Sequence, residues 1–465
     1  MPLSGARRRR YQGGNTSFNG TLGPWAHSRA STTLTIDSNG YYQQVASGVA
    51  AYDTNGLRVT PQLVNKCQGY GLIPDDQEQS PRTSGTMTVG KVYKIKVQTT
   101  TTDFVADGAP NPHAVGDTFG CTAATVTLTA GKSVAEMKWA VGTKSLYSGG
   151  TWNQNIDGIV VDTAAPTTFS VSIVDDSANL DSGTYKISQI LPNGKVLKYD
   201  NSGSASFAGC YFSGTSGNTN SHSLQVVCRV GSGTLRLSWF QSSTGSVTTT
   251  STIYVRIAAN NLTPGASYWN VQIRTEAYSV SYILLPGLYE RTVAPLYPVV
   301  ANSTSASTTQ AQTTASIPLA PNFRQDSFMV TCEVALDFAL TNLTNSTSVA
   351  IATLNSGTAA SLLYFVKDGS GNGYLTATDG TNTATVAWTP VAGTAVKIGV
   401  RGNTALNELQ VSLNGINGTA TSYDGGIAVD GQNKIYLQGI NNGFSIKNVK
   451  NSPDRGAAAL AAATA

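Results

Sequence analysis

Charged residues are scarce in this chain of 465 residues, because Asp, Glu, Lys and Arg together make up only 12% of it. That is about half of the usual share, and the net charge is only +4. Four of the positive charges form one run, Arg7–Arg10, and the rest of the chain is close to neutral. A nucleic-acid-binding surface needs basic residues spread over the folded part, so no specific nucleic-acid binding is expected.

Histidine and cysteine are also rare, which argues against most catalytic and metal sites. None of the three His residues lies in a nucleophile or metal signature. The five Cys residues have no Cys-x-x-Cys spacing, so neither a zinc site nor a full disulfide framework is expected. Cys210 and Cys228 can lie on neighbouring strands, and a reduced buried pair is expected for a protein made in a cytoplasm.

Acidic residues do not occur in the spacing of a glycosidase. Two pairs of neighbouring acids exist, Asp75-Asp76 and Asp175-Asp176. A glycosidase needs two carboxylates that face one bond across a cleft, whereas neighbouring acids on a strand point to opposite faces. No Glu-x-Asp-x-x-Glu strand and no β-helix repeat occurs either. We therefore expect no enzyme, no cofactor and no metal site.

Long apolar runs are missing as well. No run reaches the ~18 residues of a membrane-spanning helix, so no membrane insertion is expected. The basic residues near the N-terminus are not followed by an apolar core of about 7–15 residues, so no signal peptide is expected.

What the chain has in quantity is Gly, Ser, Thr and Asn, together with a hydrophobic share of 40%, too high for a disordered chain. Thr, Val and Tyr favour strands, and Gly and Asn favour turns. Apolar residues alternate with polar ones in several short runs separated by turn signals, which predicts an all-β protein. The clearest runs after residue 138 are Phe169–Val174, Gly183–Ile190, Ser223–Val230, Leu235–Phe240 and Ile253–Ile257.

One stretch, Ser267–Pro295, separates two such β-rich halves. Trp269, Val271 and Ile273 alternate with polar residues, which predicts a strand. A second apolar run, Val280–Leu285, is expected to stop at Pro286-Gly287, because Pro lacks the ladder donor and Gly permits the bend.

These signals divide the chain into two antiparallel β-sandwich domains of the jelly-roll kind with additional segments. The expected parts are an N-terminal arm at 1–60, a sandwich at 61–295 with an inserted β-element at about 83–125, a Ser/Thr-rich linker at 296–322, a second sandwich at 323–452 and an Ala-rich tail at 453–465. The tail is expected to form a short helix or to stay loose.

Two motifs resemble bacteriophage virion proteins. The first resembles the last strands of a carbohydrate-binding-module-like sandwich and is carried by Trp269, Gln272, Ser281, Tyr282, Ile283 and Arg291. The second resembles a small β-element of phage tail proteins and is carried by Tyr93, Ile95, Asp103, Phe104, Gly108, Ala109, Val115, Gly116, Phe119 and Thr122. It departs from the pattern at Cys121, where a small Ala is usual, and we interpret this as a packing substitution.

The second half resembles a concanavalin A-like, laminin-G-like lectin domain. Trp388 precedes a turn, Leu409–Leu413 is closed by Asn414-Gly415, and Ile435–Gly439 is followed by a closing strand. Gln438 lengthens the usual Tyr-Leu-Gly, so the next loop is expected to differ from the family.

The resemblance implies a phage structural protein located in the virion and made in the host bacterial cytoplasm. It would be a tail-fibre or spike subunit, a homotrimer bound to a capsid protein or tail adaptor, displaying modules that adhere to host surface polysaccharide. The alternatives are a head or tail decoration protein without glycan binding and a surface-polysaccharide depolymerase. The arm at 1–60 either anchors the protein or is a partly disordered leader, and the anchoring candidates are Arg7, Arg8, Arg9, Arg10 and Trp25.

Candidate glycan contacts are aromatic residues with polar neighbours in predicted loops, because sugars stack on aromatic faces. They are Trp152, Tyr374, Trp388, Tyr423 and Asp424, each with a core or interface role as the alternative. Asp368, Asn372, Asp379 and Asp424 are oxygen donors of the kind that Ca²⁺ takes, but no metal site is assigned to them. Trp269 and Tyr282 are expected to be packing residues and not sugar contacts.

Overall fold

The computed structural model describes most of the chain as β-structure. The described residues are 26–65, 80–88, 92–121, 123–137, 152–156, 159–162, 170–191, 194–205, 207–214, 221–239, 242–262, 269–300, 308–319, 323–354, 361–425, 434–439 and 442–465. Within them the strands pair antiparallel, and the one α-helix is α1 (Ala457–Thr464). No helix among these residues is long and apolar enough to cross a membrane. The expected all-β fold class is confirmed.

The chain divides into two compact units, and it passes between them four times. Unit 1 is Met1–Thr32, Val45–Gln62 and Ala311–Ala465, and unit 2 is Thr33–Gln44 and Leu63–Gln310. This differs from the expected arm at 1–60 and from the expected start of the second sandwich at 323. The N-terminal residues belong to both units, and the units do not follow each other along the chain.

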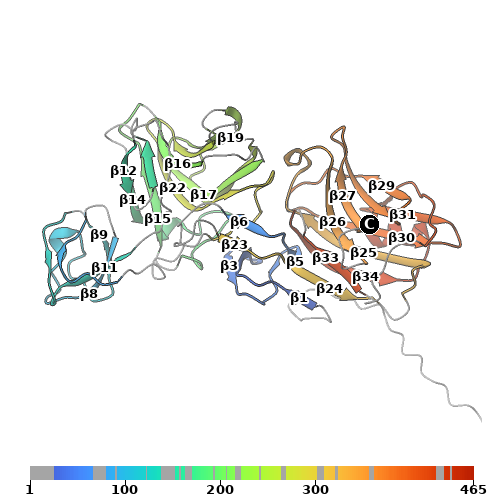
Figure 1. Ribbon diagram of the computed structural model, residues 1–465, viewed down its shortest axis with the longest axis horizontal. Helices are drawn as coiled ribbons and strands as arrows, with labels where there is room; N and C mark the ends of the chain where they lie inside the picture. Colours follow the sequence, from blue (N-terminus) through green and yellow to red (C-terminus); the bar gives the residue numbers. More distant parts are fainter. Residues whose placement is uncertain are drawn as a thin grey trace, which may run out of the picture. The chain divides into compact units, whose positions relative to one another are not determined.

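Unit 1 contains two seven-stranded sheets, and most of their strands are labelled in Figure 1. The first has the order β1 (Ala26–Ser28), β24 (Thr314–Pro318), β33 (Lys434–Gln438), β26 (Thr347–Thr353), β27 (Ser361–Lys367), β28 (Gly373–Thr378), β29 (Thr383–Ala387). The second has the order β32 (Ile416–Asn417), β31 (Glu408–Leu413), β30 (Ala395–Asn403), β25 (Ser327–Leu336), β34 (Phe444–Ser452), β5 (Gly56–Val59), β4 (Tyr52–Asp53). A 3-10 turn, η4 (Leu340–Asn342), follows β25.

Residues 45–62 complete the second sheet of unit 1, so they are not a free arm. All four residues of β5 are buried, and β5 pairs with Phe444–Ile446 of β34. The Arg58 guanidinium binds both carboxylate oxygens of Asp337 at 2.6 Å and donates to Ser445 Oγ. Gly56 turns the chain into β5 with a φ of 117°, and a Cβ there would lie 2.2 Å from the Ile446 carbonyl oxygen. Sequence pattern alone missed this strand because its partner lies in the last part of the chain.

The C-terminal tail forms α1, which packs on β25, β30 and β31. Leu460 is fully buried, and Thr464 shares a hydrogen bond with Ser412 of β31. Gly399 of β30 leaves room for the helix, because a Cβ there would lie 2.8 Å from Leu460. Of the two expected states of the tail, the structure has the helix, and it covers part of one sheet.

Unit 2 contains a six-stranded sheet and a five-stranded sheet. The six-stranded sheet has the order β12 (Trp152–Ile156), β13 (Ile159–Asp162), β16 (Ala208–Gly214), β21 (Trp269–Thr275), β18 (Leu235–Trp239), β19 (Ser242–Thr249). The five-stranded sheet has the order β14 (Ser170–Asp175), β15 (Lys195–Asp200), β22 (Val280–Tyr289), β17 (His222–Ser232), β20 (Val255–Leu262).

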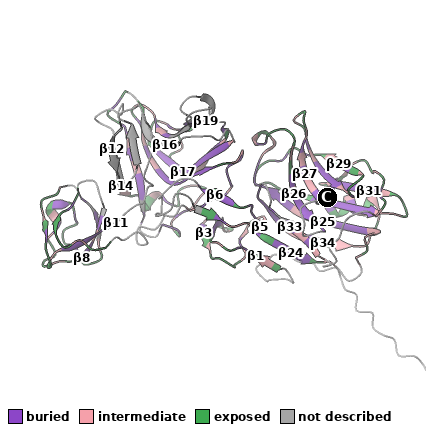
Figure 2. Ribbon diagram, viewed as in Figure 1, coloured by how far each residue is buried: buried purple, intermediate pink, exposed green. Residues whose placement is uncertain are grey.

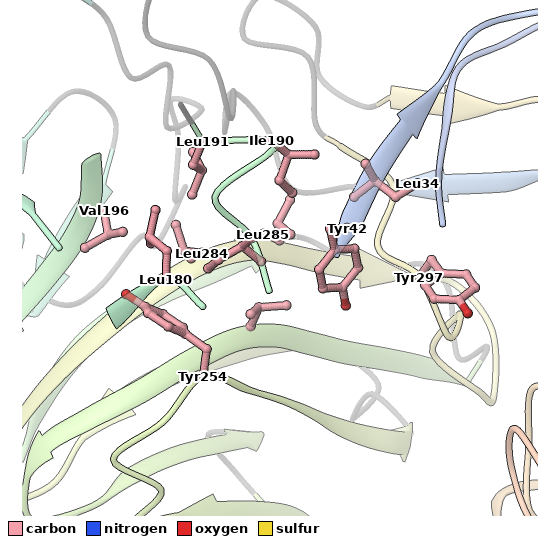
Figure 3. Close-up of a cluster of buried hydrophobic side chains, with 12 residues drawn as sticks. Leu34, Tyr42, Leu180, Ile190, Leu191, Val196, Tyr254, Leu284, Leu285 and Tyr297 are labelled. Atoms are coloured by element: carbon pink, nitrogen blue, oxygen red, sulfur yellow. The ribbon is translucent and has the colours of Figure 1, made fainter. Parts of the chain in front are cut away.

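The inner strands β22 and β17 of the five-stranded sheet are largely buried on both faces. The first nine residues of β17 are all buried, as the colouring of this strand in Figure 2 shows. One face carries Val227 and Leu284 and is covered by side chains such as Tyr42 of the β2–β3 hairpin (β2 Thr33–Ile36, β3 Tyr42–Val45; Figure 3). The other face carries Val226, which is also fully buried.

The predicted strand at Gly183–Ile190 is wrong, and it is instead part of this cover. Residues 181–190 form turns and bends after η3 (Ser177–Asn179). Ile187 is buried in the same cluster as Leu180, and so are Ile190 and Leu191, which are labelled in Figure 3. The alternating apolar residues of this segment are buried because the loop packs on the sheet. The backbone conformation depends on this packing and not only on the period of the sequence pattern.

The expected inserted β-element exists and is longer than 83–125. It comprises β7 (Gly85–Thr86) paired with β10 (Thr127–Leu128), and a sheet of β11 (Ser133–Met137), β8 (Val92–Val97) and β9 (Thr118–Gly120). The loop between β8 and β9 contains η2 (Val105–Asp107). A separate core includes Tyr93, Ile95, Phe104, Phe119 and Cys121. Five of the motif residues, including Ala109, are thus packing residues, whereas Val115 is 58% exposed and Thr122 lies outside the described residues.

The strands of the Ser267–Pro295 stretch belong to different sheets. β21 lies within the six-stranded sheet, and β22 lies within the five-stranded sheet. β22 also continues through Pro286-Gly287 to Tyr289, where Asn65 of β6 (Leu63–Asn65) donates to the Pro286 carbonyl. The expected stop at Pro286 is therefore wrong, because β17 still pairs with β22 at Gly287, Leu288 and Tyr289, and the Asn65 side chain bonds to the backbone there as well.

The expected linker at 296–322 contains two paired strands. β23 (Thr308–Gln310) pairs with β6 in unit 2, and β24 pairs with β33 in unit 1. Low charge and many Ser and Thr residues predicted an extended segment. In the structure, parts of this extended segment are paired as strands.

Candidate functional site

Two of the predicted glycan contacts are core residues. Trp388 is only 5% exposed, and its ring meets Phe365 edge-on at 5.5 Å between centroids. Tyr423 is 1% exposed, and its hydroxyl donates to the Gln325 carbonyl at 2.5 Å. Neither ring can stack on a sugar, so the glycan assignment of both is corrected to a packing role.

The other predicted contacts are not brought together. Tyr374 is half-buried in β28, on the same side of its sheet as Tyr364, because Tyr364 pairs with Thr376 two residues further along β28. Asp424 is exposed. Trp152 lies in β12, but its side chain lies outside what the structure describes, as do Trp25 and the whole of Arg7–Arg10.

Two of the candidate calcium ligands already accept hydrogen bonds from the backbone of their own loops. Asp368 accepts backbone hydrogen bonds from Ser370 and Asn372, and these lower the pKa of its carboxyl group. Asp379 accepts from the backbone of Asn382 in the same way. Among the described residues, no group of three or more His, Cys, Asp or Glu side chains could hold a metal ion.

A small cavity in unit 1 is also a poor glycan site. It has a volume of about 130 Å³ and is lined by Glu333, Lys397, Asn448 and Lys450 among others. Sites for drug-sized ligands are on the order of 300 Å³ or more, so a sugar ring with its hydroxyl partners does not fit there.

The better candidate is the outer face of the six-stranded sheet in unit 2. Leu237 and Ile273 point inward and are buried, so their neighbours Arg236 and Arg274 point outward. Arg236 of β18 lies directly opposite Arg274 of β21. We call this surface the arginine–aromatic face and define it by Phe207, Arg236, Ser246, Arg274 and Glu276.

Specific contacts hold the two guanidinium groups of this face. Arg274 Nη2 donates to Glu276 Oε2 at 2.8 Å, whereas Arg236 Nη1 lies 3.9 Å from Glu276 Oε1. Arg236 Nη2 donates to Ser246 Oγ at 3.0 Å. The guanidinium carbon of Arg274 lies 3.6 Å from the centre of the Phe207 ring, which is a close cation–π contact.

The charges of the face do not balance. Two guanidinium groups lie opposite each other with one carboxylate between them, and like charges across a strand pair cost stability. The Nε atoms of Arg236 and Arg274 are buried and have no hydrogen-bond partner within the described residues. An unbalanced positive pair is suited to bind a ligand more than to stabilise the sheet.

A second exposed aromatic residue lies in the turn between β21 and β22. Tyr278 is 61% exposed and adopts a φ of 54°, which is unusual for a residue with a side chain. Its N–H donates to the carbonyl of Ser204, three residues before Phe207, which is 37% exposed. Two accessible rings therefore lie in loops that are joined by a hydrogen bond.

The sequence carried only part of this signal. The polar side of β21, with Gln272 and Arg274, was visible as alternation. The pairing of β21 with β18 was not, since the sheet order is set by contacts between strands that are distant in sequence.

Three other arginines are paired with acids. Arg58 is bound by Asp337, Arg401 is bound by Glu408 and Asp454, and Arg229 is bound by Asp176. Arg229 also stacks on the Tyr282 ring at 3.6 Å. Because each of these guanidinium groups is paired with at least one acid, none of the three clusters has an excess of positive charge.

Comparisons with known proteins gave structural neighbours only. No protein-family model and no curated protein matches the chain. Solved structures that resemble it include a botulinum neurotoxin serotype D binding domain, at a TM-score of 0.24 and 10% identity over 32% of this chain and 38% of that chain.

Two further neighbours are of the same kind. One is a structure of botulinum neurotoxin type C, described as a toxin whose cell entry depends on interaction with two ganglioside molecules. The other is a binding domain of botulinum neurotoxin DC in complex with rat synaptotagmin II. Each has a TM-score of 0.25 and 9% identity, over 32% of this chain and 38% of that chain. The function proposed for this chain rests on its own residues.

Proposed function

We propose that the protein is an adhesion protein that binds surface glycans at the arginine–aromatic face of unit 2. The observation that carries this proposal is the exposed Phe207 ring beside a pair of arginines that share one carboxylate. Aromatic rings stack on the C–H surfaces of sugars, and polar groups at the edge of the ring bind the hydroxyls. Tyr278 supplies a second ring from the adjoining turn.

We further propose that this adhesion protein is a fibre or spike subunit of a bacteriophage virion, without enzymatic activity. The support is the resemblance of the motifs at 93–122 and 269–291 to virion proteins. A homotrimer, bound to a capsid protein or tail adaptor, would present several weak sites to host polysaccharide, so that avidity replaces single-site affinity.

A multivalent form of the full chain on a glycan array tests the binding role. Phe207→Leu and Tyr278→Asn should each weaken glycan binding about tenfold, because one stacking ring is lost and Asn tolerates the left-handed φ. Val391→Ser is the matched control, since Val391 is 62% exposed in unit 1. Absence of binding to any glycan at high valency would favour the decoration protein.

The place in the virion and the absence of catalysis need separate measurements. Labelling of this protein in electron micrographs of phage particles should mark the tail fibres or spikes, and a label on the head would favour the decoration protein. Incubation with host surface polysaccharide should release no new reducing ends, and their release would identify a depolymerase.

A further inference from the structure

We infer that the arginine–aromatic face binds a negatively charged group on a sugar, either a carboxylate or a phosphate. This inference rests on the proposed glycan binding and adds the charge of the ligand. It is carried by the distances around Glu276, which compensates one arginine well and the other poorly.

Arg236 carries the charge that is left over. Glu276 accepts a hydrogen bond from Arg274 at 2.8 Å, but its distance of 3.9 Å from Arg236 is too long for one. The other partner of Arg236 is the neutral hydroxyl of Ser246. The face therefore has an excess of one positive charge, and one anionic group beside Arg236 would balance it.

Both guanidinium groups are partly accessible and partly desolvated. Their side chains are 28% exposed for Arg236 and 21% exposed for Arg274. At such a depth an ion pair is stronger than in bulk water, while a ligand can still reach the N–H donors. Each guanidinium has five donors in a planar fork, which matches the two oxygens of a carboxylate or phosphate.

The face is also held in place before a ligand arrives. Phe207 lies under the Arg274 guanidinium, and Ser246 fixes one end of Arg236. Gly209 is the residue opposite Arg274 on β16, so no side chain there crowds the stacked pair. Little side-chain freedom is lost when an anion binds to groups held in this way, which favours affinity.

A charged ligand explains the arginine pair better than a neutral one. Hydroxyls are bound well by neutral amides, and two like charges in register are not needed for that purpose. An anionic sugar converts the repulsion between Arg236 and Arg274 into a shared attraction. Binding of the acidic form should therefore fall with rising salt, while stacking on Phe207 should not.

The test compares pairs of sugar probes, one acidic and one neutral, that are otherwise closely similar. Binding of the full chain to polygalacturonic acid is measured against its methyl ester, and binding to immobilised mannose 6-phosphate is measured against mannose. We expect at least one acidic probe to bind about tenfold more tightly than its neutral counterpart at low salt. The two arms distinguish a carboxylate from a phosphate.

Charge variants locate the effect. Arg236→Gln should remove the preference for the acidic probe, and Arg236→Lys should keep part of it, because a point charge remains without the planar fork. Arg324→Gln removes an equally charged side chain in unit 1 that is 70% exposed, and it should change nothing. A circular dichroism spectrum of each variant checks that the fold is kept, and Arg236→Lys stays informative if the Gln variant fails to fold.

The outcomes separate the inference from the proposed function. Equal binding of acidic and neutral probes, or an acidic preference that survives in Arg236→Gln and Arg236→Lys alike, would overturn the charged ligand and leave glycan binding standing. Failure to bind any sugar, acidic or neutral, would overturn both.

Discussion

At the scale of single residues, the buried ion cluster of unit 2 shows how charge is used inside a sheet protein. Asp176 is 6% exposed and accepts hydrogen bonds from Arg229, from the Tyr254 hydroxyl at 2.6 Å and from Asn179 at 2.7 Å. Burial alone raises the pKa of Asp176, but these hydrogen bonds outweigh it and hold the pKa below its usual value. The cluster fastens the turn around η3 to β17 and to the chain just before β20.

This lowered pKa predicts acid sensitivity of unit 2. A carboxyl group with a depressed pKa in the folded state stabilises the fold above its unfolded pKa of about 4, and this contribution is lost as the pH falls through the folded value. Asp176→Asn should destabilise unit 2 by about 3–5 kcal/mol at neutral pH, because Arg229 stays buried without its acid. Its free energy of unfolding should also depend less on pH below about 4.

Urea unfolding followed at several pH values measures both effects. Asp181→Asn is a matched control, since Asp181 is an exposed carboxylate nearby that accepts two hydrogen bonds, both from Ser188. Equal stability of the Asp176→Asn variant and the original chain at neutral pH would show that the cluster does not hold the turn.

At the scale of elements, β5 covers the edge of β34 in the second sheet of unit 1. Leu57 and Val59 are buried, and Arg58 is bound to Asp337, the residue directly after β25. A fragment of residues 311–465 lacks β1, β4 and β5, so it leaves an unpaired edge and a buried carboxylate without its arginine.

We expect this fragment alone to be poorly soluble or only partly folded. A synthetic peptide of residues 45–62 should restore a cooperative unfolding transition when it is added to the fragment, and Arg58→Ala in the peptide should abolish the rescue. The measurement is thermal unfolding monitored by circular dichroism. A fragment that unfolds cooperatively and at the same temperature without the peptide would contradict the role given to β5.

Strand positions were more predictable than strand partners. The runs Ser223–Val230 and Leu235–Phe240 coincide closely with β17 and β18, because both strands have an apolar face that must be buried. The pairing of β5 with β34 could not be predicted, since the two strands are far apart in the sequence and neither sequence indicates which strand it pairs with. The same reason hid the Arg236–Arg274 pair.

The aromatic candidates failed for a different physical reason. Trp388 and Tyr423 have polar neighbours in sequence, yet each ring buries a large apolar area when it packs on Phe365 or Phe328. Sequence neighbours indicate where a backbone turns, but they do not indicate which way a ring points. Core packing was the stated alternative for both residues, and it is the role that the structure gives them.

At the scale of the whole molecule, each unit carries a buried thiol that reports on its own stability. Cys332 lies in unit 1 and Cys228 in unit 2, and both are reduced and buried. Burial raises the pKa of Cys332 to about 12 and also raises the pKa of Cys228. At neutral pH the folded chain should therefore react with alkylating reagents on the order of a thousandfold more slowly than a free thiol.

Pulse alkylation during heating, read by mass spectrometry, should show Cys332 and Cys228 losing protection in two separate steps. The reason is that each unit has its own core and therefore its own cooperative transition. Simultaneous loss of protection at both thiols would indicate that the units unfold as one.

The pairing of β5 with β34 also delays the folding of β5 during synthesis of the chain. Val59 pairs with Phe444, so β5 leaves the ribosome roughly 400 residues before its partner exists. At about 5–20 residues per second, this apolar strand waits on the order of 20–80 s with its hydrogen-bonding edge uncovered. A helper that shields exposed strands during translation, or a second nascent chain that offers the missing edge, would therefore decide how much of the protein reaches its native pairing.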